Sequence, residues 1–240
     1  MPESDSSTLR HPAAALAAGL WMAVLAAVAT PAGAEPQHRY LGGFDRVELN
    51  TAAKVVIRRG DADAIVVDAT PAQLPLIGTQ VENDTLKVVD QPGIEGPPAQ
   101  VLITLRQLRA LAASGVTQVT TDGLAARELS ITGGGASALT LRQLHVSRLR
   151  VALGGGSQLL LTGRTRELNA QLGGQAGLDA ADFDVEEAMV QGGGRSHATV
   201  SVRQSLNVAI AGASVVSYYG SVQPTVAIGA QATLRALGKR

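Results

Sequence analysis

Apolar and polar residues alternate along most of the chain, and from about residue 108 small glycine clusters divide this alternation into units of similar length. One glycine in each cluster serves as an anchor for aligning the units. Successive anchors are 20, 20, 19, 20, 18 and 18 residues apart. The anchors are Gly115, Gly135, Gly155, Gly174, Gly194, Gly212 and, at the seventh position, Ala230.

Apolar residues recur at fixed offsets from these anchors. Because the spacing within a unit is two residues, the pattern is typical of β-strands that turn one face inward. The residues four before the anchors are Leu111, Ile131, Val151, Ala170, Val190, Val208 and Val226. The residues four after the anchors are Val119, Leu139, Leu159, Leu178, Ala198, Val216 and Leu234.

A fixed unit of short strands and glycine corners predicts a solenoid, in which each coil pairs its backbone with the coils above and below. Each unit has room for two or three strands of about four residues, with a corner between each. We therefore predict an all-β fold, a parallel β-helix with coils of about 18–20 residues. The rule for parallel crossovers makes it right-handed. The alternative is an antiparallel sandwich with glycines in ordinary turns, but such a fold does not usually repeat one small residue at one offset.

The first half of the chain, about 38–107, is also rich in predicted strands but less regular. Turn signals at 59–61, 82–84 and 91–93 separate the strands, and 71–77 is either a short helical turn or a loop. We expect this half to begin the same stack, so that residues 35–240 form one domain with regular coils over about 108–237. The predicted strands span 44–49, 55–57, 65–68, 86–90 and 101–105.

The N-terminal segment 1–34 has the pattern of a secretory signal peptide. Arg10 and His11 precede an apolar run over 12–28, and small residues at Ala32 and Ala34 form a cleavage site. We predict cleavage after Ala34 and a periplasmic, extracellular or cell-surface location. The alternative is an uncleaved anchor, although the run is Ala-rich and barely long enough to span a bilayer. No later apolar run is long enough to span a membrane.

Composition agrees with a narrow, stacked interior. The chain has 27 glycines, only 2% aromatic residues and no cysteine, so disulfides do not hold it together. Lys plus Arg and Asp plus Glu are equal at 20 each, which argues against a nucleic-acid-binding protein or a polybasic membrane surface.

Several segments resemble the GIN domain family, also called the head domain of auto-transporter adhesins. They are the predicted strand segments 44–49, 55–60, 64–68 and 86–89, followed by Ser114-Gly115 and the later glycine repeats. The resemblance covers about 40–235. It implies an exported bacterial β-helical domain of uncharacterised function, with adhesion carried by the family name, and it transfers no catalytic residues.

The residues two after the anchors form a column of small side chains, most of them hydroxylic. A functional interpretation is a ladder that bonds glycans; the structural interpretation, which we favour, is a corner ladder that bonds the backbone. The hydroxyls are Thr117, Ser137, Ser157, Ser196 and Ser214.

Charged residues are segregated along the repeats, with arginines on the second and third coils and acidic residues on the next. They predict either a surface for an anionic or metal-linked glycan or, as we favour, a solvated exterior with weak cross-coil ion pairs. The arginines are Arg127, Arg142, Arg148, Arg150, Arg164 and Arg166. The acidic residues are Asp179, Asp182, Asp184, Glu186 and Glu187.

The remaining candidates carry weaker signals. The histidines, His38, His145 and His197, lack metal-ligand spacing. Alternation places Asp182 and Asp184 on one side of a strand, as a glycosidase pair requires, and it turns one ring of Tyr218-Tyr219 outward.

We therefore predict no catalytic, cofactor or metal residues. The expected function is a non-enzymatic adhesion or envelope-polysaccharide-binding module. Two alternatives remain open: a polysaccharide lyase or hydrolase, and a structural protein that self-associates through uncapped coil ends. Expected partners are an envelope or extracellular polysaccharide, another cell-surface component, or a second copy of the chain.

Overall fold

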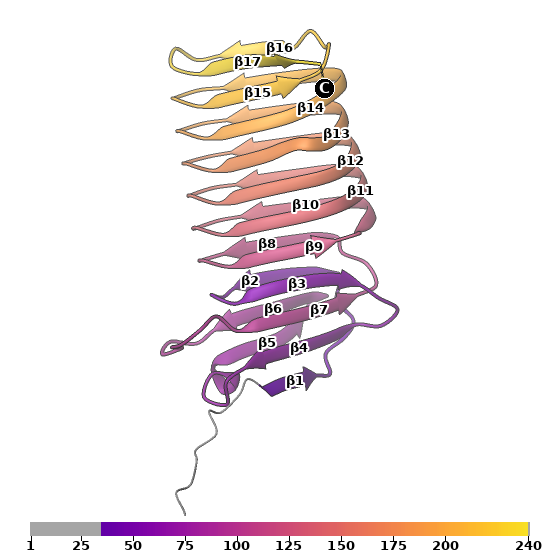
Figure 1. Ribbon diagram of the computed structural model, residues 1–240, viewed down its shortest axis with the longest axis vertical. Coiled ribbons are helices and arrows are strands. Elements are labelled where there is room, and N and C mark those ends of the chain that lie inside the picture. Colours follow the sequence, from indigo (N-terminus) through magenta and orange to yellow (C-terminus); the bar gives the residue numbers. More distant parts are fainter. Residues whose placement is uncertain (1–34, 240) are drawn as a thin grey trace, which may run out of the picture. The chain divides into compact units, whose positions relative to one another are not determined.

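The computed structural model describes residues 35–239, in which the strands join into one sheet that winds into a stack of coils (Figure 1). The predicted β-solenoid is confirmed, while its right-handed sense stays a prediction. The predicted signal peptide, 1–34, lies outside the described residues. The first strands are β1 (Glu35–Arg39), β2 (Arg46–Asn50), β3 (Lys54–Arg59), β4 (Ala64–Ala69), β5 (Ile77–Glu82), β6 (Thr85–Asp90), β7 (Gln100–Leu105), β8 (Ala110–Ser114) and β9 (Gln118–Asp122). The later strands are β10 (Ala125–Gly133), β11 (Ala138–Leu153), β12 (Gln158–Leu172), β13 (Gly177–Gly192), β14 (His197–Ile210), β15 (Val215–Tyr219), β16 (Thr225–Ile228) and β17 (Thr233–Gly238).

Strands β8 to β17 pair in parallel, and the repeat positions read from the sequence stack directly on one another. Ile131 pairs with Val151 and Leu111, and the same column continues coil by coil to Val226. Parallel in-register pairing explains the sequence periodicity, because each apolar position must fit against its equivalents in the neighbouring coils.

The glycine anchors form the sharp corners of the coils. All six have positive φ values between 64° and 73°, the left-handed region that glycine adopts without strain. The corners also stack closely, since the N–H after one anchor donates to the carbonyl of the preceding anchor, from Ala136 to Gly115 at 2.8 Å and from Gly156 to Gly135 at 2.7 Å. Among the described residues this series ends at Ala213, because the seventh anchor, Ala230, does not adopt positive φ.

In the coils of β11 to β14 the side opposite the glycine corners has no break between strands, so the prediction of short strands with a corner between each was wrong there. The chain does break at this side between β9 and β10, at Gly123, and between β15 and β16, at Gly220. β11 continues as one strand over Ala138–Leu153 and bends at a register shift between Leu141 and Leu144. Gln143 adopts φ 51° at this bend. A bulge lets a strand turn while keeping most of its ladder, so β11 passes the bend without a glycine, whereas β12 has Gly163 there at φ 123°.

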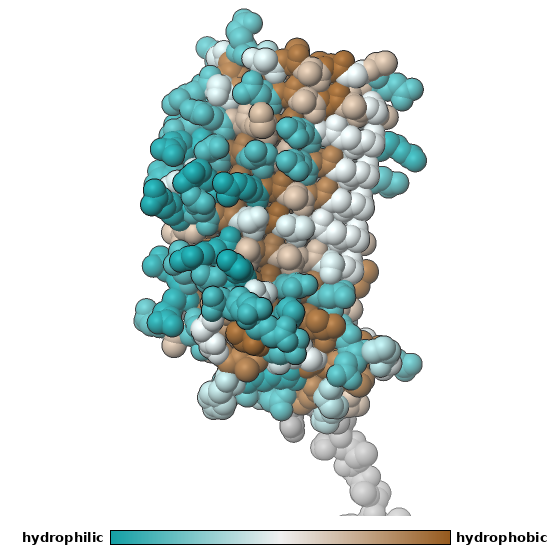
Figure 2. All heavy atoms as spheres, turned by 180° about the vertical axis from the view of Figure 1, so that it is seen from behind, coloured by the Kyte–Doolittle hydropathy of each residue, from teal (hydrophilic) through white to brown (hydrophobic). Residues whose placement is uncertain are grey.

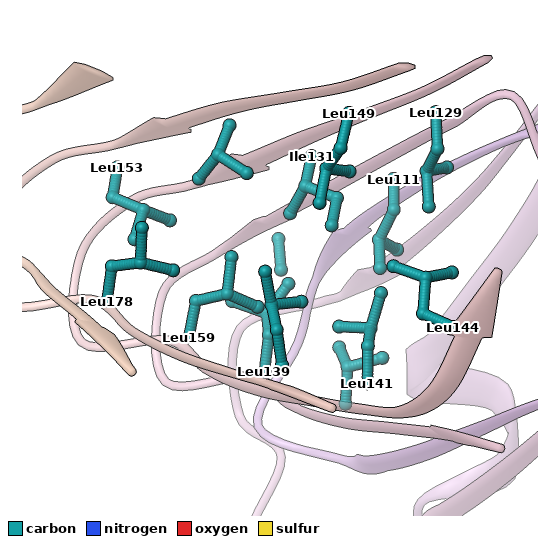
Figure 3. Packing of buried hydrophobic residues seen from close by; sticks show 14 of the residues in the cluster. Leu111, Leu129, Ile131, Leu139, Leu141, Leu144, Leu149, Leu153, Leu159 and Leu178 are labelled. Atoms are coloured by element: carbon teal, nitrogen blue, oxygen red, sulfur yellow. The ribbon is translucent and has the colours of Figure 1, made fainter. Parts of the chain in front are cut away.

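The single sheet turns back on itself within each coil, and its two facing walls, called sheets below, enclose a narrow core. Figure 3 shows Leu139, Leu141 and Leu159 pointing toward Ile131 and Leu149 from the opposite sheet. These side chains are almost completely buried, and they are branched aliphatics of similar size. Such columns fill a thin interior at high density, which leaves little room for aromatic rings.

The first half of the chain joins the stack in an order that differs from the sequence. β2 and β3 lie between the coil formed by β6 and β7 and the coil formed by β8 and β9. Beyond β6 and β7, the antiparallel strands β1, β4 and β5 cover the N-terminal end (Figure 1). A short 3-10 turn, η1 (Leu74–Leu76), lies within the segment predicted as a helical turn or a loop.

Arg39 links parts of the cover at the N-terminal end through its side-chain hydrogen bonds. Its guanidinium donates to the carbonyls of Leu74 and Ile77 and to the Thr79 hydroxyl, which joins β1 to η1 and β5. Partial burial lowers the pKa of Arg39 from its usual value. The N-terminal end is therefore formed by antiparallel strands held by a bonded side chain, with β1 paired only to β4 and β5 only to β6 among the described residues.

Candidate polymer-binding surface

The hydroxyl column lies inside the corners and not on the surface. All five hydroxylic members are buried. Thr117, Ser157 and Ser214 each donate to the carbonyl three residues earlier, at 2.7, 2.9 and 2.7 Å. The structural interpretation is thus confirmed for these three. The hydroxyls of Ser137 and Ser196 are enclosed in the same way without a bonding partner, so the column offers nothing to a glycan.

The charged residues are on the outer surface, and several of them lie near the bend, opposite the glycine corners. Arg148 and Arg150 both pair with Glu128 of the previous coil, the second at 3.7 Å, and Arg203 pairs with Asp184. These cross-coil ion pairs agree with the interpretation of a solvated exterior. Exposed pairs of this kind contribute only about 0–1 kcal/mol each to stability.

A hollow of about 430 Å³ opens among these charges. His145, Arg164 and Arg166 line it together with Asp184 and Glu186. Positive and negative groups thus share one depression, which leaves no surface of a single sign within it. A strongly anionic ligand would meet two carboxylates there.

The predicted carboxylate pair is only half assembled. Asp182 and Asp184 do turn outward on either side of the buried Phe183. Only Asp184 lines the hollow, where it pairs with Arg203 and neighbours Glu186. The structure therefore brings Asp184 together with Glu186 in place of Asp182.

The other candidates stand apart from one another. Among residues 35–239 no group of three or more His, Asp or Glu side chains could hold a metal ion, and His38, His145 and His197 lie on β1, β11 and β14. Tyr218 is buried and Tyr219 is half-buried, as alternation predicted.

A shallow trough of about 820 Å³ runs across β10 to β14, beside the glycine corners. Its outward side chains form one column, three residues before each anchor, and they pair in register from coil to coil. Figure 2 shows the pale, near-neutral band along one edge of the stack and the hydrophilic groups gathered on the opposite side. The column is Thr132, Ala152, Gln171, Gln191 and Ala209.

The trough is lined by uncharged residues only. Glycines such as Gly154, Gly173 and Gly193 expose backbone at its floor, and no charged residue lines it. Gln171 and Gln191 are exposed, and a side-chain amide has two donors and an acceptor. One donor of Gln191 contacts the Met189 sulfur at 3.9 Å.

This surface was not among the sites predicted from the sequence. The residues three before each anchor are uncharged from Thr132 to Ala209, and this pattern could have been read from the sequence. Outward-facing positions are not constrained by packing, however, so nothing distinguished this column from other exposed residues.

Within the described part of the chain, 35–239, no helix has the length and apolar character needed to cross a membrane.

The stacked coils, the glycine corners and the open trough define a class of protein, the parallel β-solenoids with a long exposed sheet face. More specifically, the chain belongs to the GIN domain family. The family model described as "Putative auto-transporter adhesin, head GIN domain" matches residues 43–222. The resemblance seen in the sequence is confirmed by this match.

Solved structures share this fold at low sequence identity. A "putative adhesin" from Bacteroides fragilis superposes with a TM-score of 0.79 at 16% identity, covering 85% of this chain and 97% of that one. A "putative lipid binding protein" from Parabacteroides distasonis gives 0.70 at 14%, covering 85% and 97%. A "putative adhesin" from Parabacteroides merdae gives 0.64 at 12%, covering 85% and 96%. A comparison with curated proteins found no match.

Membership of this family supports an adhesin-like, non-enzymatic role and a location at the cell surface or outside the cytoplasm. The structural likeness, at these identities, concerns the fold alone.

Proposed function

We propose that this protein is an exported, non-enzymatic module that binds an extended, uncharged polysaccharide along the trough on β10 to β14. The observation that supports the proposal is the in-register column of uncharged side chains, which repeats at each coil. Adjacent coils lie about 4.8 Å apart. A polymer lying along the stack would therefore meet an uncharged side chain at every step, with amides at Gln171 and Gln191.

The chemistry of the trough favours a hydroxyl-rich polymer over a polypeptide. On a sheet face the backbone N–H and C=O groups are already paired between coils, so a peptide could not add as an extra strand there. The amides of Gln171 and Gln191 can bond sugar hydroxyls. The glycine and alanine floor offers apolar surface to the carbons of a sugar ring.

Export is part of the same proposal. Segment 1–34 would direct the chain out of the cytoplasm and be removed after Ala34, leaving Glu35 as the first residue. N-terminal sequencing of the protein recovered outside the cytoplasm checks this point, and a retained residue 1–34 segment would refute it.

The trough is tested by a double variant, Gln171→Ala with Gln191→Ala. Two hydrogen bonds at about 1 kcal/mol each predict binding to a neutral polysaccharide that is about thirtyfold weaker. The measurement is affinity on a panel of neutral and acidic polysaccharides, first surveyed with the unaltered residues 35–240. Gln158→Ala is the matched control, because Gln158 is an exposed amide on the same strand β12 but outside the trough.

Two results would contradict the proposal. One is binding only to acidic polymers, which would point to the arginines of the bend. The other is an equal loss of affinity in Gln158→Ala, which would show that the trough amides have no particular role.

A further inference from the structure

The last described coil, formed by β16 and β17, leaves apolar inward positions open to solvent. Val226 and Ile228 are 49% and 45% exposed. Their equivalents one coil earlier, Val208 and Ile210, are each only 3% exposed. Among the described residues β16 pairs only with β14, and β17 only with β15. One edge of each strand therefore carries unpaired backbone groups, the feature that promotes association with another strand.

The two ends of the stack differ. The N-terminal end is covered by β1, β4 and β5, and Arg39 bonds that cover in place. The outermost strands of the N-terminal end also have one unpaired edge each, because among the described residues β1 pairs only with β4 and β5 only with β6. β1 reads EPQHR and so offers no aliphatic column to match the exposed apolar residues of the open end. Two copies of the open end carry matching apolar columns, which favours a symmetric contact over head-to-tail growth.

We propose that the open end, defined as residues 225–238, binds the same end of a second copy of this chain in a two-fold symmetric dimer. The two strands of the open end lie on opposite sheets and run in opposite directions, because a sharp corner joins them (Figure 1). A two-fold rotation about an axis parallel to the strands lays β16 of one copy beside β17 of the other. The paired strands are then antiparallel, and the same pairing forms twice, as an isologous interface requires.

The side chains of this arrangement are compatible. Placing corner over corner sets Ile228 beside Leu234 of the second copy and Val226 beside Ala236 of the second copy. These four occupy inward columns of the coil, so the apolar interior continues from one copy into the other. Arg235 then lies beside Ala227 of the second copy, and no like charges meet on the paired strands.

Sedimentation equilibrium of residues 35–240 tests the association. We expect a monomer–dimer equilibrium at micromolar concentrations, which the variant Val226→Lys with Ile228→Lys shifts to monomer. Leu160→Lys is the matched control, because Leu160 is a similarly exposed apolar residue in the middle of the stack, at 37%. A monomer at all concentrations, or a dimer that survives the double variant, would overturn the proposal.

Single cysteines test the geometry without perturbing the coil, since the chain has none of its own. Gln231→Cys lies at the tip of the terminal corner, near the two-fold axis, and should form a disulfide-linked dimer on oxidation because disulfides require closely spaced Cα atoms. Ala213→Cys, at the same corner position one coil earlier, should remain monomeric on denaturing gels. Equal cross-linking of both variants, or of neither, would contradict corner-over-corner pairing.

Discussion

Replacement of the anchor Gly155 by alanine should destabilise the protein by about 3 kcal/mol or more, a large share of a typical domain's stability. Two causes add. A left-handed φ of +67° costs a residue with a Cβ about 1–2 kcal/mol. The new methyl group would also lie 2.7 Å from the Gly135 carbonyl oxygen, where only a shift of the stacked backbone could relieve the contact.

Two controls separate these causes. Gly154→Ala should change stability by less than about 1 kcal/mol, because Gly154 has no positive φ and no atom within 4 Å of the added Cβ. Gly123→Ala should show the φ cost alone, because its φ is +67° but its Cβ would be free of contacts. The measurement is urea unfolding followed by circular dichroism. Equal stabilities for all three variants would contradict the close stacking of the corners.

Deletion of one complete coil should leave a folded protein, whereas deletion of half a coil should not. Removing residues 156–174 joins the anchor Gly155 to Gln175. Gln175 normally follows the next anchor, Gly174, so the sequence on both sides of the junction keeps the repeat pattern. β11 and β13 can then pair as β11 and β12 do now. The stability of a solenoid is approximately a sum over repeats and their interfaces, so we expect cooperative unfolding at a lower denaturant concentration.

Removing only 156–165 is the matched comparison. This deletion joins the corner to the bend of β12, so the strand that follows the corner in every other coil is lost. The residues that remain would have to stack out of register with both neighbours, which exposes inward positions and buries outward ones. We expect no cooperative unfolding transition from this chain. A folded half-coil deletion would show that the repeat does not define the coil.

The regular half of this fold was predictable because parallel in-register stacking requires similar residues at equivalent positions of successive coils. Each coil repeats the inward residues of its neighbours, so Ile131 has recognisable equivalents in every unit, and the corner glycine Gly135 has one in all but the last. The bend was not predictable, because a bulge such as that at Gln143 needs no conserved residue type and interrupts no apolar run.

The N-terminal cover was only partly visible in the sequence. β1 and β5 were missed, and the placement of β2 and β3 between later strands was not foreseen. Antiparallel pairing over long sequence separations leaves no repeat to detect. A local signal did exist at Asn83 and Asp84, a predicted turn whose residues both adopt positive φ, as in the tight turns that join paired strands.

The central claim, one coil for each repeat, is tested most directly by dipolar EPR between spin labels at Ala136→Cys and Ala213→Cys, both one residue after an anchor. Four coil spacings separate these corners, which predicts about 19 Å between the labelled backbones. In the chain lacking 156–174 the separation should fall to about 14 Å. An unchanged distance, or one that does not follow the number of coils between the labels, would contradict the stacked solenoid.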